Sequence, residues 1–170
     1  MGVDMWYADV AVVLMGRRRV QRLPAVFVGT AAAAGVMLLR SDGTPSLFFD
    51  AEELRCRCGG RHGVACDGWP AAPNFGIDAR LVDLLDRIRD LVGPVYVTCG
   101  YRCVVHNRAV GGRSGSLHLV GKAADIVART MPAPGVQGLL ETFLPPVPGV
   151  GAYASFTHVD VRDGRARWDG

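Results

Sequence analysis

The sequence lacks a basic stripe of the kind that binds nucleic acid. Its formal net charge is only +3 at pH 7, and its arginines are scattered along the chain and form no cluster with interleaved aromatic residues. Nucleic-acid-binding surfaces combine clustered Lys and Arg, which neutralise phosphates, with aromatic rings that stack on bases. We therefore expect no nucleic-acid partner.

Internal repeats are absent as well, and the length excludes a large multidomain protein. A chain of 170 residues forms one domain with a proper core but does not comfortably form two. We expect a single domain that acts as a monomer.

Cysteine is abundant for a reduced cytosolic enzyme, and its count of five is odd for a fully disulfide-bonded protein. A glycine-rich loop contains Cys56, Cys58, His62 and Cys66. Their C-x-C-x3-H-x3-C spacing is not one of the strong zinc signatures. We expect disulfides or buried thiols in this loop, with a small structural metal site as the alternative; the state of Cys103 stays open.

An uncharged stretch, residues 23–39, follows a basic segment that contains Arg17, Arg18, Arg19 and Arg22. Its length is at the lower limit for a membrane-spanning helix, about 17–25 residues, and the preceding arginines favour an N-terminus inside the cytoplasm. The stretch also suits a signal peptide with an A-x-A cleavage motif at 32–34. The alternatives are a core helix and a leader that results from a misassigned start codon.

The next residues, 41–46, have the sequence SDGTPS, which predicts a turn-rich linker. We therefore divide the chain into a leader, 1–46, with a candidate signal or membrane anchor at 23–39, and a folded domain, 47–170. This division predicts that the domain is exported, or anchored to the membrane outside the cytoplasm.

The folded domain shows a pattern of helices followed by strands. Apolar residues repeat at helical spacing over 78–92, which predicts the main packing helix. Asp50 and Glu53 are spaced to cap a helical turn that presents Phe48, Phe49 and Leu54 inward. The other predicted elements are strands at 95–99, 123–128, 150–153, 156–161 and 166–168, helical segments at 104–110 and 136–144, and a hairpin turn at Asp163-Gly164. This order predicts an α+β fold, an antiparallel sheet with helices packed to one side.

The segment 114–125 places His118 seven residues before Asp125, and the aspartate lies in the apolar run AADIVA. A buried carboxylate needs a cation, because burial of even a neutral polar group without a partner costs roughly 2–7 kcal/mol. A metal would supply that charge, with His118 and Asp125 as ligands and His158 as the third. Two imidazoles and one carboxylate with an open fourth position are typical of catalytic zinc. The alternative is a loop histidine and a capping aspartate.

His158 and Asp160 are two residues apart in a predicted strand, so their side chains leave the same face. A carboxylate beside a ligating histidine either orients the imidazole or accepts a proton from water as general base. Asp160 is our candidate for the base. Its alternative role is that of a structural partner for a histidine or an arginine.

Four motifs occur in a fixed order: GYR at 100–102, HN-x-x-VGG at 106–112, S-x-H-x6-D at 116–125 and H-x-D at 158–160. Each is weak alone, but in this order they resemble the D-alanyl-D-alanine carboxypeptidase family of zinc peptidases. The resemblance covers about 47–168. It implies a fold like that of the hedgehog signalling domain and the lysostaphin-type endopeptidases. It also implies zinc ligands at His118, Asp125 and His158.

The same resemblance implies that Arg102 and Ser116 contact the substrate. A guanidinium can form a bidentate, charge-assisted pair with a C-terminal carboxylate; the alternatives are a structural salt bridge for Arg102 and a turn role for Ser116. The chain departs from many relatives at Ser155, because they carry a carboxylate three residues before the last histidine. The base is therefore either Asp160 or a group that the sequence does not identify.

Together these features predict a zinc metallopeptidase that cuts near D-amino acids in peptidoglycan stem peptides, as a carboxypeptidase or an endopeptidase. The rival hypothesis is a non-catalytic, metal-containing module of the same fold that binds cell-wall peptides or a protein. A phage-encoded enzyme of this kind would stay in the cytoplasm until lysis.

Overall fold

The computed structural model describes residues 37–58, 66, 68, 73–144 and 147–170. Most of the predicted leader, including residues 23–36 of the candidate anchor, lies outside these residues. In the part of the chain that is described, no helix has the length and apolar character needed to cross a membrane.

The described chain begins with a two-stranded antiparallel sheet of β1 (Met37–Leu39) and β2 (Pro45–Asp50). Leu38 is fully buried in the core, and the side chain of Asp86 on the main helix accepts hydrogen bonds from Ser46 Oγ and Leu47 N. Because β1 ends at Leu39 and β2 begins at Pro45, the predicted linker at 41–46 contains most of the turn between these strands. Its flanking strands belong to the same compact unit as the rest of the domain.

A five-stranded sheet forms the centre of the domain, in the order β3-β4-β6-β5-β7. Its members are β3 (Val95–Cys99), β4 (Ala123–Ala128), β5 (Gly149–Ala152), β6 (Thr157–Asp160) and β7 (Ala166–Asp169). Three pairings are antiparallel as predicted, but β5 and β7 run parallel. After β6 the chain passes β5 and forms β7 at the edge of the sheet. There β7 pairs with β5 and runs in the same direction. The Asp163-Gly164 turn thus connects strands that are not neighbours, so the prediction of a hairpin was wrong.

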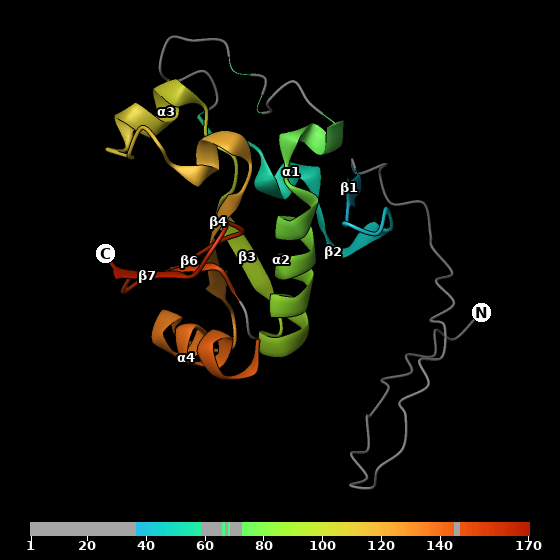
Figure 1. Cartoon of the computed structure of the whole chain (residues 1–170), viewed down its shortest axis with the longest axis vertical. Helices are drawn as coiled ribbons and strands as arrows, with labels where there is room; N and C mark the ends of the chain where they lie inside the picture. The colour runs from blue at the N-terminus through green and yellow to red at the C-terminus, as the bar shows by residue number, and fades with distance from the viewer. Residues whose placement is uncertain (1–36, 59–65, 67, 69–72, 145–146) are drawn as a thin grey trace, which may run out of the picture. The chain divides into compact units, whose positions relative to one another are not determined.

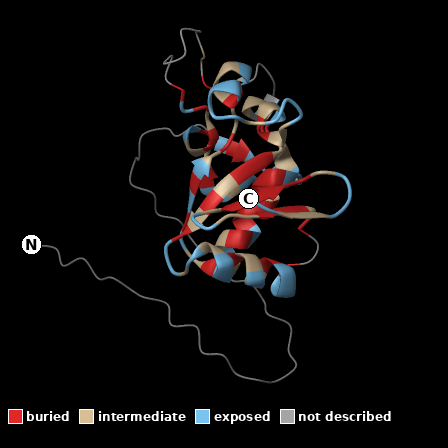
Figure 2. Cartoon of the chain, turned by 90° about the vertical axis from the view of Figure 1, so that its left-hand side faces the viewer, coloured by how far each residue is buried: buried red, intermediate tan, exposed pale blue. Residues whose placement is uncertain are grey.

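Two helices, α2 (Ala79–Val92) and α4 (Ala133–Phe143), pack on one face of this sheet and against each other, as Figure 1 shows. The N-cap Asp78 accepts a hydrogen bond from Arg80 N, which starts α2 one residue later than predicted. Pro134 occupies the first turn of α4, where its missing N–H is tolerated, so α4 begins before residue 136. Figure 2 shows buried strands and exposed outer helix surfaces.

The remaining elements are short: α1 (Ala51–Leu54), η1 (Pro73–Gly76), α3 (Val104–Ala109) and η2 (Leu117–Val120). The predicted cap of α1 is present, because Asp50 accepts from Glu53 N and Glu53 accepts from Asp50 N. Phe49 and Leu54 are buried, but Phe48 is 37% exposed. The prediction for Phe48 was wrong because it lies on β2, whose alternation turns it outward beside the Arg89 guanidinium.

Strand alternation gives the sheet two different faces. The face under α2 and α4 carries apolar side chains, among them Val97, Ile126 and Val159. The opposite face receives the intervening residues, including Asp125 on β4 and His158 on β6. The sheet therefore separates the hydrophobic core from the predicted site.

Candidate metal centre

The predicted carboxylate and imidazole lie side by side on neighbouring strands. Asp125 on β4 is opposite His158 on β6 in the antiparallel register, so both side chains leave the same face of the sheet. Asp125 Oδ1 is 2.8 Å from His158 Nδ1. The strand pairing alone thus brings together two of the three predicted ligands.

His118 reaches the same point from η2, a single helical turn that ends at Gly121 in the left-handed region, with φ 65°. The His118 side chain is almost completely buried. Its Nδ1 lies 2.7 Å from Gly100 O, and because a carbonyl only accepts, Nδ1 is the donor. The other nitrogen, Nε2, lies 3.3 Å from Asp125 Oδ1 and 3.2 Å from His158 Nδ1.

The second nitrogen of His158 is fixed in the same way. His158 Nε2 lies 3.3 Å from Asp160 Oδ2, and an ionised carboxylate only accepts hydrogen bonds. With Nε2 as the donor, Nδ1 of neutral His158 directs a lone pair at His118 Nε2 and Asp125 Oδ1. Three lone pairs converge here in a buried place, and only a metal ion or a proton can hold them together.

The charges of this cluster are mutually dependent. Burial acts to raise the pKa of Asp125, but the adjacent imidazoles of His118 and His158 outweigh it and hold that pKa below its usual range. Burial acts to lower the pKa of His158, but Asp125 and Asp160 outweigh it and raise that pKa. A proton on His158 Nδ1 therefore competes with a metal ion for the same lone pair.

Asp160 is buried beneath His158 and is paired with Arg162. The guanidinium donates to both carboxylate oxygens, with Arg162 Nε 2.8 Å from Oδ1 and 3.0 Å from Oδ2. Burial acts to raise the pKa of Asp160, but the hydrogen bonds from His158 and Arg162 outweigh it and hold that pKa well below its usual range. Asp160 is therefore an ionised acceptor for His158 Nε2.

Two glycines on β5 make room on this face of the sheet. A Cβ at Gly149 would lie 2.2 Å from Asp160 Oδ1, and a Cβ at Gly151 would lie 2.6 Å from the Trp168 ring. Because Gly151 has no Cβ, the Trp168 ring can lie over β5, with its centroid 5.1 Å from that of the His158 ring. The Arg162 guanidinium lies 4.8 Å from the centroid of the same indole. The glycines thus allow Asp160 and Trp168 to pack beside His158.

A cleft of about 1230 Å³ opens over this cluster, and both predicted substrate-binding residues line it. Arg102 lies next to the ligand turn, since its backbone N–H donates to His118 O at 3.1 Å. The Arg102 Nε atom is buried and has no hydrogen-bond partner among the described residues. Ser116 precedes η2, and its side chain makes no capping hydrogen bond. Arg102 therefore has unused hydrogen-bonding capacity, and Ser116 does not use its hydroxyl as a helix cap.

Ser155 lies between β5 and β6 and is exposed. Among the described residues that line the cleft, the side-chain carboxylates are those of Asp125 and Asp169. Asp125 belongs to the ligand cluster, and Asp169 is an exposed residue at the end of β7. The cleft thus offers Asp169 as an acidic side chain that the sequence motifs did not indicate.

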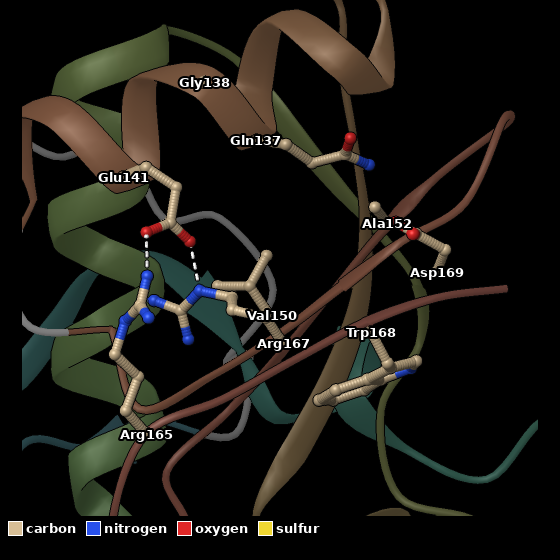
Figure 3. A pocket seen from close by; sticks show the side chains of 9 residues that line it. All are labelled: Gln137, Gly138, Glu141, Val150, Ala152, Arg165, Arg167, Trp168 and Asp169. Atoms are coloured by element: carbon tan, nitrogen blue, oxygen red, sulfur yellow. Dashed lines mark hydrogen bonds and ion pairs between the residues drawn. The ribbon is translucent and has the colours of Figure 1, made fainter.

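A smaller hollow of about 450 Å³ lies between α4 and the β5–β7 edge of the sheet (Figure 3). Glu141 on α4 forms ion pairs with Arg165 and Arg167 in this hollow. These pairs neutralise Glu141, and none of the predicted ligands lines the hollow. The larger cleft is therefore the candidate active site.

A fourth potential donor lies near the cluster. Cys99 Sγ is 3.8 Å from His118 Nδ1, and Cys99, His118 and Asp125 form a group with the spacing of metal ligands. However, His118 Nδ1 donates to Gly100 O, so it is the Nε2 atom that faces Asp125 and His158. His118, Asp125 and His158 therefore remain the candidate ligand set.

Besides Asp169, sequence reasoning missed Arg162, Gly149 and Gly151. Arg162 follows Asp160 by two residues, and the spacing of two that linked His158 to Asp160 would also have indicated it. The glycines carried no such signal, because their role depends on the pairing of β5 with β6 and β7.

Comparison with protein families agrees with this geometry. Residues 48–160 match the family model described as Peptidase M15. No curated protein gives a significant match to the chain. Because the family model covers well over half of the sequence, the chain belongs to the Peptidase M15 family of zinc peptidases, which includes D-alanyl-D-alanine carboxypeptidases.

Proposed function

We propose that this protein is a zinc metallopeptidase that hydrolyses peptide bonds next to D-amino acids in peptidoglycan stem peptides. The observation that carries the proposal is the convergence of His118 Nε2, His158 Nδ1 and Asp125 Oδ1 in an open cleft. Two nitrogens and one oxygen suit zinc with a position left for water or substrate. Zinc held by these residues would polarise the scissile carbonyl and lower the pKa of bound water to about 7.

The surrounding residues keep the ligands in the required state. Gly100 O accepts the Nδ1 hydrogen of His118, and Asp160 accepts the Nε2 hydrogen of His158. Each acceptor fixes one ring tautomer and directs the other nitrogen at the centre. Asp160 is itself held ionised by Arg162. We therefore assign Asp160 first to positioning His158, with the general-base role as the alternative.

Arg102 and Ser116 hold the substrate in this proposal. The buried Arg102 Nε, which lacks a partner in the described chain, favours a carboxylate ligand, since a guanidinium binds carboxylates in two parallel hydrogen bonds. The terminal D-amino acid of a stem peptide carries such a carboxylate. This feature supports a carboxypeptidase over an endopeptidase.

One observation favours the rival function, a non-catalytic binding module. The Asp160 carboxylate is already bonded to Arg162, and an exposed serine occupies position 155. A cleft with a metal but no available base would bind a cell-wall peptide without cleaving it.

Incubation of the zinc-loaded protein with a stem pentapeptide ending in D-Ala-D-Ala distinguishes the two functions. We expect release of free D-alanine, which mass spectrometry would detect. We expect no release from the same peptide ending in L-alanine. Internal cleavage would assign an endopeptidase. Saturable binding without any cleavage would overturn the peptidase proposal in favour of the binding module.

We further propose that the domain acts outside the cytoplasm as a monomer on the cell wall, with the hedgehog-like fold implied by its motifs. The basic segment and the uncharged residues 23–36 that precede the described domain support export. A reporter fused after Gly43 should appear outside the cytoplasmic membrane. A reporter retained in the cytoplasm would favour release by lysis.

A further inference from the structure

A second group of metal-ligating side chains lies away from the cleft, and the proposed peptidase activity makes no use of it. It consists of four cysteine thiols, at Cys56, Cys58, Cys66 and Cys103. They come from three places in the chain: the segment after α1, residue 66, and the N-cap of α3. Figure 1 shows α1 and α3 at the same end of the sheet. The fold thus gathers residues that are far apart in sequence.

The sulfur positions suit a tetrahedral metal site. The four Sγ atoms all lie within 4.8 Å of one another, and Cys103 Sγ is 3.9 Å from Cys58 Sγ. Zinc–sulfur bonds of about 2.3 Å place neighbouring sulfurs of a tetrahedron about 3.8 Å apart. None of the five cysteines, all of which lie in the described part of the chain, forms a disulfide.

Several N–H groups point at these sulfurs. The backbone N–H of Cys103 donates to Cys56 Sγ, and that of His106 donates to Cys103 Sγ, each at 3.4 Å. The His106 ring nitrogen Nδ1 also lies 3.3 Å from Cys56 Sγ. A neutral thiol is a weak acceptor, whereas hydrogen bonds to the charged form favour the thiolate.

Burial makes a cation necessary if these sulfurs are thiolates. Cys56 and Cys58 are only 2% and 3% exposed, and several negative charges in so little volume require a multivalent counter-charge. A tetrahedral set of four sulfurs is diagnostic of zinc or of iron. Zinc is the usual ion of closed structural sites with four cysteines.

We propose that Cys56, Cys58, Cys66 and Cys103 hold a structural zinc ion, separate from the centre at His118, Asp125 and His158. This ion would join the segment after α1 to the start of α3. Cys103 directly follows Arg102, and Tyr101 N donates to Leu54 O at 2.7 Å. The second zinc therefore holds in place the segment that presents Arg102 to the cleft.

Zinc analysis of the reduced full chain and of single variants tests the proposal. Plasma mass spectrometry should give two zinc ions per chain for the wild type. It should give one for His118→Ala and one for Cys58→Ser. Cys99→Ser is the matched control, because this cysteine lies outside the group of four, and it should keep two.

X-ray absorption of the zinc in His118→Ala provides a test that does not depend on folding of a cysteine variant. We expect coordination by sulfur alone, at about 2.3 Å. Coordination by nitrogen and oxygen, absence of zinc from His118→Ala, or iron in its place would overturn the proposal. A wild type with one sulfur-bound zinc would support this inference while contradicting the zinc centre of the proposed peptidase.

Discussion

The two faces of the five-stranded sheet have opposite physical character, although they are built from alternate residues of the same strands. On β4, Ile126 lies in the hydrophobic core under the helices, whereas its neighbour Asp125 belongs to the cluster with His118 and His158. One face removes apolar surface from water, which stabilises the fold. The other places charged and polar groups at low exposure, which costs free energy unless they are paired.

The helix-covered face therefore contributes to the free energy of folding, whereas the buried polar groups of the opposite face reduce it unless they are paired. The helix-covered face supplies the rigid support for a cluster whose lone pairs oppose one another without a cation. The Asp160–Arg162 pair and the Gly100 carbonyl then orient the imidazoles on that support. Changes on the two faces should therefore affect different measurements.

The largest expected effect is on the open face. His118→Ala removes one of the three converging candidate ligands. If the proposed zinc centre is correct, the activity against a stem peptide should fall by roughly 10³-fold or more, because metal catalysis contributes several kcal/mol to transition-state stabilisation. The rate of D-alanine release at saturating zinc measures this effect. Circular dichroism would check that the fold is retained. Near-normal activity would contradict the assignment of His118 as a ligand.

The convergence of His118, Asp125 and His158 was predictable because its information is local. The spacing of His118 and Asp125, and the alternation that links His158 to Asp160, can be read from short segments. The structure adds the register in which Asp125 opposes His158. The strand at 95–99 and the helix over 78–92 were predictable for the same reason, since their apolar periodicity is contained within each segment.

On the core face, Ile126→Ala should lower the free energy of unfolding by about 2–5 kcal/mol, because the change leaves a cavity beneath α2 and α4. Ile126 is 1% exposed, so water cannot readily fill the cavity that the smaller side chain leaves. Urea denaturation measures the loss. Zinc content per folded chain should stay at the wild-type value, and a loss of zinc equal to that of His118→Ala would remove the distinction between the faces.

Gly149→Ala tests whether the open face is as closely packed as the core. The new methyl group would lie 2.2 Å from Asp160 Oδ1, and such overpacking typically costs about 1–3 kcal/mol. We expect a lower urea midpoint together with weaker zinc binding, because Asp160 must move away from His158. Gly138→Ala on α4 is the matched control, with no atom within 4 Å of the added Cβ. It should stabilise the helix by about 0.5–1 kcal/mol.

Features that depend on distant pairing were not predictable. The parallel arrangement of β7 and β5, and with it the place of Trp168 over Gly151, follows from a chain crossing that no local pattern indicates. Cys103 joins Cys56 and Cys58 for the same kind of reason, since they are separated by more than forty residues. The cysteine loop was therefore interpreted from its own spacing, without its fourth member.

The smallest expected effect concerns Asp160, which lies on the open face but is as buried as the core. Asp160→Asn keeps the size of the side chain and removes its charge. If Asp160 orients His158, zinc affinity should fall by about 10–100-fold, and excess zinc should restore turnover. If Asp160 is the general base, zinc binding should stay normal while turnover falls by about 10²–10⁴-fold.

We expect the first result, because Arg162 holds the Asp160 carboxylate ionised with a pKa well below its usual range, and a carboxylate so stabilised is a weak proton acceptor. Zinc titration and steady-state kinetics on the same samples separate the two roles. Asp169→Asn is the control within the cleft, since it removes the exposed carboxylate that lines it. If turnover falls at normal zinc affinity in Asp169→Asn alone, Asp169 on β7 is the general base. The role of Asp160 is then to orient His158.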